Sequence, residues 1–173
     1  FYTFSVLSYI FDVYYGKCHA ERNILDYLLY VSFFPKVISG PIVQFHDFKN
    51  QLVHRIVTRK GVVEGTQLFM LGLFKKVLLA DQLGMAYSSF AQTDTVVGSY
   101  FTVISYGLQL YFDFSGYSDM AIGLASIFGF NFGKNFDEPY TSHSISEFWR
   151  RWHISLGAWF RDYVYIPLGG NRV

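Results

Sequence analysis

An uncharged run of eighteen residues, from Thr95 to Phe112, limits the possible folds of this chain more than any other feature. As an α-helix rising about 1.5 Å per residue, the run would be about 27 Å long, close to the roughly 30 Å hydrocarbon core of a bilayer. The whole chain is 51% hydrophobic and 21% aromatic, which is richer in aromatic side chains than a typical soluble domain. These observations predict an all-α membrane protein with a spanning helix over 95–112.

Two further hydrophobic segments are interrupted by charges or prolines. Residues 24–43 contain Asp26, Lys36, Pro35 and Pro41, and residues 62–80 contain Glu64, Lys75 and Lys76. Such interruptions favour helices packed within a bundle over helices isolated in lipid. Residues 120–130 are apolar but too short to span, and glycines punctuate this region, so we expect a broken or re-entrant helix there.

Loop charges give an orientation for this bundle. Residues 44–60 are mainly basic and are predicted to be cytoplasmic, whereas residues 81–94 have no basic side chain and are predicted to be an outside loop. The chain has no initiator Met and no signal peptide, so we interpret 1–173 as part of one transmembrane domain, truncated at both ends. The predicted fold is a polytopic transmembrane helical bundle, and the predicted location is multi-pass in the cell inner (plasma) membrane.

Several functional classes lack their signatures. The formal net charge is +1 and the basic residues are scattered, so nucleic acid is not an expected partner. Cys18 is the only cysteine, and the histidines show no metal-binding spacing, so no metal site is predicted. The chain also has neither the nucleophile elbow of serine hydrolases nor a phosphate-binding loop.

The C-terminal part carries the strongest amphipathic pattern. Ser144 and Glu147 have the spacing of a capping box, and Pro167 with the glycines after it predicts the end of a helix that begins near Ser144. Its aromatic stripe lies opposite a basic face, with His153 at the edge. The periodicity favours an interfacial amphipathic helix, and a helix that lines a polar chamber within a membrane protein is the alternative.

Two groups of side chains are candidates for chemistry. Asp113 and Asp119 flank a glycine turn, where they could take part in proton transfer or serve as helix caps and ion-pair partners. His153 is the best single candidate for a base, because imidazole titrates near neutral pH and can accept a proton from an alcohol. A hydrogen-bonded structural histidine is the alternative for this position.

With these residues identified, the chain resembles the membrane-bound O-acyltransferase (MBOAT) family, and within it the branch that O-acetylates alginate. The resemblance extends over nearly the whole chain, with its blocks in family order. The blocks are Phe33-Phe34-Pro35, Gly40-Pro41-Ile42, Gly72 to Lys76, Ala80-Asp81, Tyr111 to Asp119, Asn135-Phe136, Pro139-Tyr140, Glu147 to His153 and Arg161-Asp162-Tyr163.

The resemblance implies an O-acyltransferase that moves an acyl group, in the simplest case acetyl, from a cytoplasmic-side donor to hydroxyls of an exported polysaccharide. The implied donor is acetyl-CoA or another acyl thioester, with no bound cofactor. The implied partners are the lipid bilayer, the polysaccharide and periplasmic or extracellular acetylation proteins.

The family singles out two histidines, of which His153 matches the first. The second has no counterpart before Val173, so the fragment alone is expected to be inactive, and His153 serves either as the base or in handling the donor. We expect Arg150, Arg151 or Arg161 to hold anionic donor groups or stabilise the oxyanion, and Asp113 and Asp119 to orient them.

Other functions remain open at this point. The same family fold supports D-alanyl transfer to teichoic acid. Broken helices with intramembrane charges are also typical of a transporter or channel, and a scaffold subunit that recruits a separate acetylase is a third possibility. The acceptor polymer and the oligomeric state are not determined by the sequence.

Overall fold

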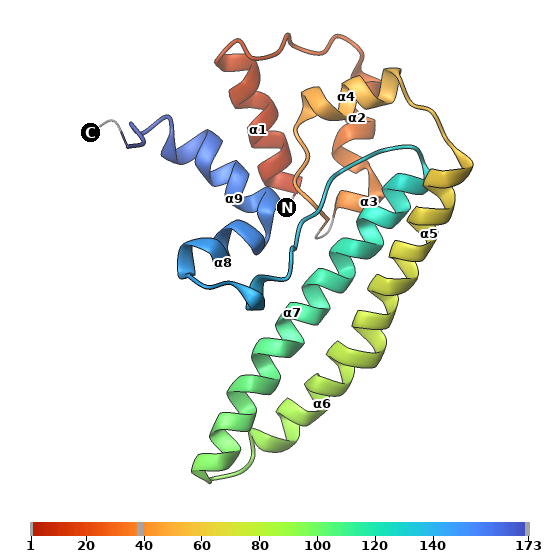
Figure 1. The fold of residues 1–173 in the computed structure, drawn as a ribbon. Helices are drawn as coiled ribbons and strands as arrows, with labels where there is room; N and C mark the ends of the chain where they lie inside the picture. The colour runs from red at the N-terminus through yellow and green to blue at the C-terminus, as the bar shows by residue number, and fades with distance from the viewer. Residues whose placement is uncertain (1, 38–39, 172–173) are drawn as a thin grey trace.

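A computed structural model describes residues 2–37 and 40–171, and in these residues helices and connecting segments make up the whole structure, without strands (Figure 1). The all-α prediction is confirmed for this part of the chain. The helices are α1 (Tyr2–Tyr14), α2 (Ile24–Ser32), α3 (Phe34–Val37), α4 (Phe45–Val53), α5 (Arg59–Phe74), the π-helical η1 (Lys75–Ala80), α6 (Asp81–Phe90), α7 (Val96–Ile127), the 3-10 turn η2 (Pro139–Thr141), α8 (Ile145–Arg151), α9 (Ile154–Phe160) and the π-helical η3 (Arg161–Tyr165).

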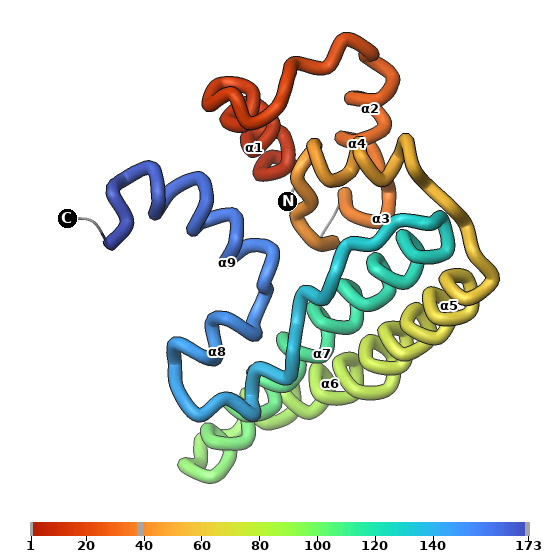
Figure 2. Tube along the Cα trace, turned by 45° about the horizontal axis from the view of Figure 1, so that its top comes forward, coloured from red at the N-terminus to blue at the C-terminus, as the bar shows by residue number. Residues whose placement is uncertain are grey.

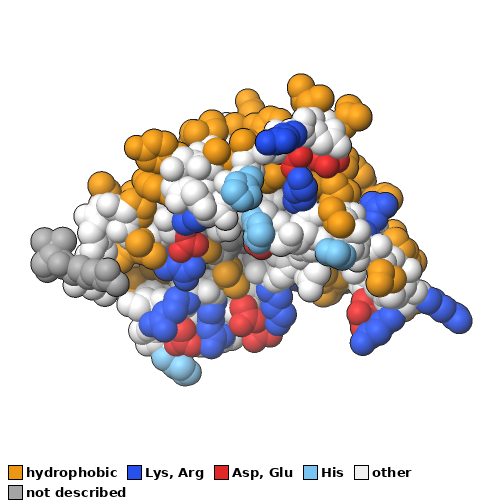
Figure 3. All heavy atoms as spheres, turned by 90° about the horizontal axis from the view of Figure 1, so that it is seen from above, with side chains coloured by type: hydrophobic (Ala, Val, Ile, Leu, Met, Phe, Trp, Pro, Cys, Tyr) orange, Lys and Arg blue, Asp and Glu red, His pale blue; other side chains and the backbone are white. Residues whose placement is uncertain are grey.

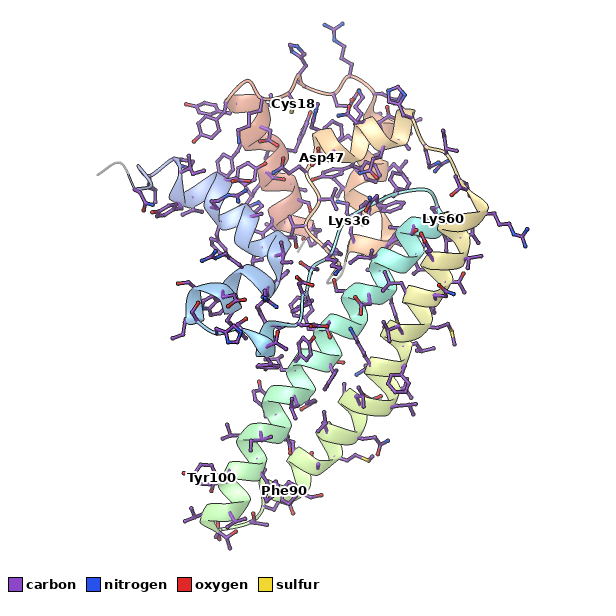
Figure 4. The ribbon with its side chains drawn as sticks, in the orientation of Figure 1. Cys18, Lys36, Asp47, Lys60, Phe90 and Tyr100 are labelled. Atoms are coloured by element: carbon purple, nitrogen blue, oxygen red, sulfur yellow. The ribbon has the colours of Figure 1, made fainter. Side chains whose placement is uncertain are left out.

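A long antiparallel hairpin dominates the structure. One arm is the continuous run α5–η1–α6, the other is α7, and the hairpin extends away from the remaining helices (Figure 1). Phe90 and Tyr100 lie at its closed end and Lys60 at the opposite end (Figure 4). At the closed end the rings of Phe90 and Phe101 stack with centroids 5.1 Å apart.

Glycines allow the two arms to touch through their backbones. A Cβ added at Gly72 would lie 2.4 Å from the carbonyl oxygen of Gly116, and one added at Gly123 would lie 2.5 Å from that of Gly65. Both distances are too short for carbon against oxygen, so only glycine fits these positions. Gly116 and Gly123 therefore promote helix packing, and the predicted break at 120–130 is wrong because these residues continue α7 as far as Ile127.

The second packing unit is an aromatic core at the open end of the hairpin. It is formed by α2 and its C-cap, by α4 and the segment before it, and by the C-terminal end of α7 and the segment after it. Its buried members are Tyr30, Phe33, Val43, Phe45, Phe48, Ala125 and Phe130. The rings of Phe48 and Phe130 are nearly parallel, with centroids 5.0 Å apart. The hydroxyl of Tyr30 lies 2.8 Å from the carbonyl oxygen of Val43, so the one polar atom of this ring has a partner.

The predicted membrane elements are only partly confirmed. Among the described residues, none of the helices is both long enough and apolar enough to cross a bilayer. The run 95–112 is helical from Val96 onward, with Thr95 as the N-cap. It is uncharged but not strongly hydrophobic, since it includes Ser99 and Gln109. Residues 24–37 form α2 and α3 rather than one helix, and positions 38–39 of that predicted span lie outside the described residues. The predicted loop at 81–94 is wrong, because most of it is α6.

The C-terminal helices α8 and α9 lie beside α7 and α1. An extended segment, residues 128–138, connects α7 to them and runs back between α7 and the α8–α9 pair (Figure 2). Trp159 of α9 donates its indole N–H to the carbonyl oxygen of Phe4 at 3.0 Å, which ties α9 to α1. Figure 3 shows charged and histidine side chains in the middle and along one side of this face, with hydrophobic side chains around them.

Candidate functional site

Helix α8 begins at Ile145 with Ser144 as its N-cap, as the capping pattern predicts. The hydroxyl oxygen of Ser144 accepts the backbone N–H of Glu147 at 3.1 Å. The Glu147 carboxylate accepts the backbone N–H of His143 at 2.9 Å, so the reciprocal bond of the capping box reaches one residue further than usual. This backbone hydrogen bond is the main reason why the pKa of the Glu147 carboxyl is lowered.

The helix that the pattern predicts from Ser144 onward is interrupted at His153. His153 has φ 44° and ψ 58°, the left-handed conformation, between the end of α8 at Arg151 and the start of α9 at Ile154. A side chain in this conformation is unfavourable, although histidine tolerates it better than β-branched residues do. The prediction that His153 lies at the edge of a continuous apolar stripe is therefore wrong, because the backbone turns a corner there.

The corner is fastened on both sides to the extended segment. The N–H of Asp137 donates to the carbonyl oxygen of Arg151, and the N–H of Ile154 donates to that of Asn135, both at 2.9 Å. The side-chain oxygen of Asn135 also accepts the N–H of Ser155 at 3.1 Å and its hydroxyl at 2.9 Å. Asn135 thus supplies the hydrogen bonds that an N-cap side chain would normally supply to α9.

The imidazole of His153 lies in an aromatic setting and is 4% exposed. The ring of Phe114 meets it edge-on with centroids 4.7 Å apart, and the ring of Phe136 lies nearly parallel at 6.2 Å. Burial lowers the pKa of His153 to about 4. The imidazole is therefore neutral at neutral pH, the form that accepts a proton from an alcohol.

The three candidate arginines bind partners close to them in sequence. Arg150 donates to the carbonyl oxygen of Ser146 at 3.3 Å, and Arg151 donates to Glu147 at 2.6 Å. Arg161 forms a two-pronged ion pair with Asp162, at 2.7 and 3.2 Å. Arg150 and Arg161 are largely exposed, so their guanidinium groups are accessible from outside the fold.

The two candidate aspartates lie on α7 and pair with lysines of the π-helical segment η1. Lys75 binds Asp119 at 2.6 Å, and Lys76 binds Asp113 at 2.7 Å and Asp81 at 2.8 Å. In their recorded ion pairs the aspartates thus bind lysines, in place of the arginines that the sequence analysis expects them to orient. Since both positions lie within α7, neither aspartate caps a following helix.

Two open cavities flank the extended segment. One, of about 430 Å³, lies between α4, the extended segment and α9, and its lining includes Asp47, Asn50, Ile154, Ser155 and Trp159. The other, of about 450 Å³, lies on the hairpin side, and its lining includes Lys75, Asp119, Tyr111 and Glu138. Asn131 and Lys134 line both cavities, so the segment that fastens the His153 corner also forms a wall between them.

The residues that support His153 are not apparent from the sequence. Phe114, Asn135 and Phe136 stand out only as parts of family blocks, and Ser155 has no predicted role. Their proximity to His153 depends on the chain folding back over a distance of 20 residues, as the contacts between Asn135 and Ser155 show. The lysine–aspartate pairs could have been predicted from the sequence, because one hydrophobic segment contains two lysines and the next contains two aspartates.

The fold thus places a buried histidine at a corner between two helices, and backbone hydrogen bonds fasten that corner within a helical scaffold. Comparison with known proteins identifies the family to which this scaffold belongs. The model of the membrane-bound O-acyltransferase family matches residues 20–173. The chain belongs to the membrane-bound O-acyltransferase family.

Curated relatives agree with this assignment. The chain is 52% identical to a protein named "Probable alginate O-acetylase AlgI" from Azotobacter vinelandii, over 99% of this chain and 35% of the relative. It is also 52% identical to the protein of that name from Pseudomonas aeruginosa, over 99% of this chain and 34% of the relative. A peptidoglycan O-acetyltransferase of Helicobacter pylori is 44% identical over 87% of this chain and 30% of the relative. The chain thus spans about a third of the length of these relatives.

Proposed function

We propose that the full-length protein containing this chain is an O-acyltransferase that moves an acetyl group from a cytoplasmic-side thioester, in the simplest case acetyl-CoA, to hydroxyls of an exported polysaccharide such as alginate. The observation that carries the proposal is the 52% identity to alginate O-acetylases over 99% of the chain. The buried, neutral imidazole of His153 supports it, because acyl transfer to an alcohol needs a proton acceptor.

In the proposed reaction the acceptor hydroxyl gives its proton to a histidine as its oxygen attacks the thioester carbonyl. The new C–O bond forms, the C–S bond breaks, and the histidine returns the proton to the leaving thiolate. Base catalysis of this kind contributes roughly 10²- to 10⁴-fold to the rate. We assign His153 to this step, acting together with the second histidine of the family pattern, which has no match within residues 1–173.

Arg150 and Arg161 are the better candidates for holding anionic groups of the donor, because their guanidinium groups are exposed. Arg151 is held at Glu147 and Thr141, which favours a role in shaping the turn before α8. Asp113 and Asp119, with their lysine partners, fix η1 against α7, which supports an indirect role in forming the cavity that Lys75 and Asp119 line.

We further propose that the protein lies in the inner (plasma) membrane as a polytopic helical bundle, with α8 and α9 near the membrane interface. Family membership supports this location, as do the large hydrophobic side chains exposed along the hairpin. Those of α7 include Val96, Val97, Tyr100, Phe101, Val103, Ile104, Tyr106 and Leu110. The proposed partners are the bilayer, the polysaccharide and acetylation proteins outside the membrane.

The test is the O-acetyl ester content of the polymer, measured by NMR, in cells that express the full-length protein with His153→Asn. Asparagine tolerates the left-handed conformation, so this change removes the imidazole while adding little backbone strain. The matched control is His143→Asn, because His143 is exposed and its recorded bond uses only the backbone N–H. Membrane abundance of all three proteins is equalised first.

We expect the ester content to fall by roughly 10²-fold or more in His153→Asn. In His143→Asn we expect the wild-type ester content. Undiminished ester in His153→Asn would contradict the assignment of His153 to the transfer step. Purified full-length protein given acetyl-CoA and polysaccharide then tests the activity itself. D-alanyl esters in place of acetyl esters would favour the alternative function, D-alanyl transfer to teichoic acid. Absence of transfer would favour a transporter or a scaffold subunit.

A further inference from the structure

The corner at His153 poses a physical problem that its own sequence does not solve. The residue adopts a left-handed backbone conformation, which is unfavourable and persists only where surrounding contacts determine it. A helix start also leaves backbone N–H groups without intrahelical partners, and the side chain of His153, at the N-cap position of α9, makes no capping hydrogen bond. Something else in the fold must hold this backbone.

Asn135 meets both needs. Its carbonyl oxygen accepts the N–H of Ile154 at 2.9 Å, and its side-chain oxygen accepts the N–H of Ser155 at 3.1 Å. These are the N–H groups of the two residues that directly follow His153. Asn135 is 1% exposed, so these hydrogen bonds are shielded from competing water.

A second set of contacts extends the hold on His153. The hydroxyl of Ser155 donates to Asn135 at 2.9 Å while its oxygen accepts the N–H of Ile42 at 3.0 Å, which ties the corner to the segment before α4. The residue after Asn135 is Phe136, whose ring lies nearly parallel to the imidazole. Asn135 therefore sets both the backbone that carries the imidazole and the ring beside it.

We infer that Asn135 is the positioning residue for His153: the Asn135 side-chain oxygen, through Ser155, fixes the left-handed corner that holds the imidazole between Phe114 and Phe136. The catalytic consequence of this inference rests on the proposed function of His153. The geometric part does not, because it concerns only where the imidazole is held.

The experiment compares the full-length protein with Asn135→Ala, Asn135→Asp and Asn131→Ala. Alanine removes the side-chain acceptor, whereas aspartate keeps it. Asn131 is the matched control, since it lies in the same extended segment and its side chain accepts only the local N–H of Gly133 among its recorded bonds. Two quantities are measured: the rate at which diethyl pyrocarbonate modifies His153, followed by peptide mass spectrometry, and kcat and KM for acyl transfer.

In Asn135→Ala we expect His153 to be modified about tenfold faster, because the corner opens more often. We expect kcat to fall roughly 10- to 100-fold because the imidazole is misplaced, with KM within about twofold of the wild-type value. Asn135→Asp should keep modification and kcat near the wild-type values, and Asn131→Ala should match the wild type in the rate at which His153 is modified. A merely structural role would lower abundance without this rescue by aspartate.

Wild-type modification of His153 in Asn135→Ala, or equal impairment of Asn135→Ala and Asn135→Asp, would overturn the inference. If Asn135→Ala does not fold, Ser155→Ala replaces it, because that change removes the hydroxyl and leaves the Ser155 N–H in place. Faster modification of His153 in Ser155→Ala supports the inference, and an unchanged rate overturns it. If His153→Asn proves fully active, the modification rate alone still decides whether Asn135 holds the histidine, so the two proposals fail separately.

Discussion

The α5–α7 hairpin and the His153 corner are stabilised by opposite means. The hairpin is regular, and its arms meet where side chains are absent, at glycines whose backbones touch. The corner is irregular, and it is held by polar and aromatic side chains from segments far apart in the chain. A regular scaffold thus carries an irregular site, which is the arrangement expected where a functional side chain needs an unusual backbone conformation.

The largest expected effect concerns the glycine contacts of the hairpin. In Gly72→Ala the new methyl group would meet backbone atoms of Gly116 and Met120 at 2.4 and 2.7 Å, so the arms must separate. We expect the free energy of unfolding to fall by about 3 kcal/mol or more. Thermal unfolding of the detergent-purified full-length protein measures it. Gly107→Ala is the control, because its Cβ would meet only the Tyr140 hydroxyl at 3.9 Å, and equal stability of the two variants would refute backbone contact as the basis of the hairpin.

The next prediction concerns the corner and its pH dependence. Burial holds the pKa of His153 at about 4, below the ordinary 6.5, so the unfolded chain binds the proton more tightly. Stability from the neutral imidazole is complete above pH 6.5 and is lost as the pH falls toward 4, by an amount on the order of 3 kcal/mol. His153→Asn should flatten the dependence of unfolding free energy on pH across this window. The same slope in both proteins would show that His153 does not titrate in this way.

A third prediction separates the hairpin's ion pairs from its glycine contacts. The side chains of Lys75 and Asp119 are 21% and 18% exposed, so Lys75→Met leaves a partly buried carboxylate without its cation. We expect a loss of about 1–2 kcal/mol in the free energy of unfolding, which Lys75→Met combined with Asp119→Leu largely restores. Denaturant titration measures it. Lys60→Met, which breaks the exposed pair with Glu64, should change stability by less than about 0.5 kcal/mol.

The smallest expected effect tests the capping of α8 beside the corner. Ser144→Ala removes the hydroxyl that accepts the N–H of Glu147, so we expect a loss of about 1 kcal/mol. Ser144→Asp should retain the stability, because its carboxylate accepts the same N–H. Thermal unfolding of the two variants decides the point, and a stable alanine variant would mean that the packing of α8 makes the cap unnecessary.

Local chemistry made several features predictable. The all-α class follows from long hydrophobic segments, and the start of α8 at Ser144 follows from a pattern that spans four residues. The sequence predicts a break at the glycines of α7, and the structure shows a continuous helix, because a glycine that breaks a helix and one that allows close packing have the same sequence signature. The break at His153 was also missed, since periodicity describes side-chain directions and assumes a continuous backbone.

The sequence by itself determined the helical character, the family and the residue types at the candidate site, because composition, capping patterns and motif blocks are local properties of the chain. Only the tertiary structure decided which residues support His153 and which partners Asp113 and Asp119 take. Asn135 reaches Ser155 across 20 residues, and Lys75 reaches Asp119 across 44. Such contacts depend on how the helices fold back on one another, and the order of residues along the chain does not encode that geometry in any local pattern.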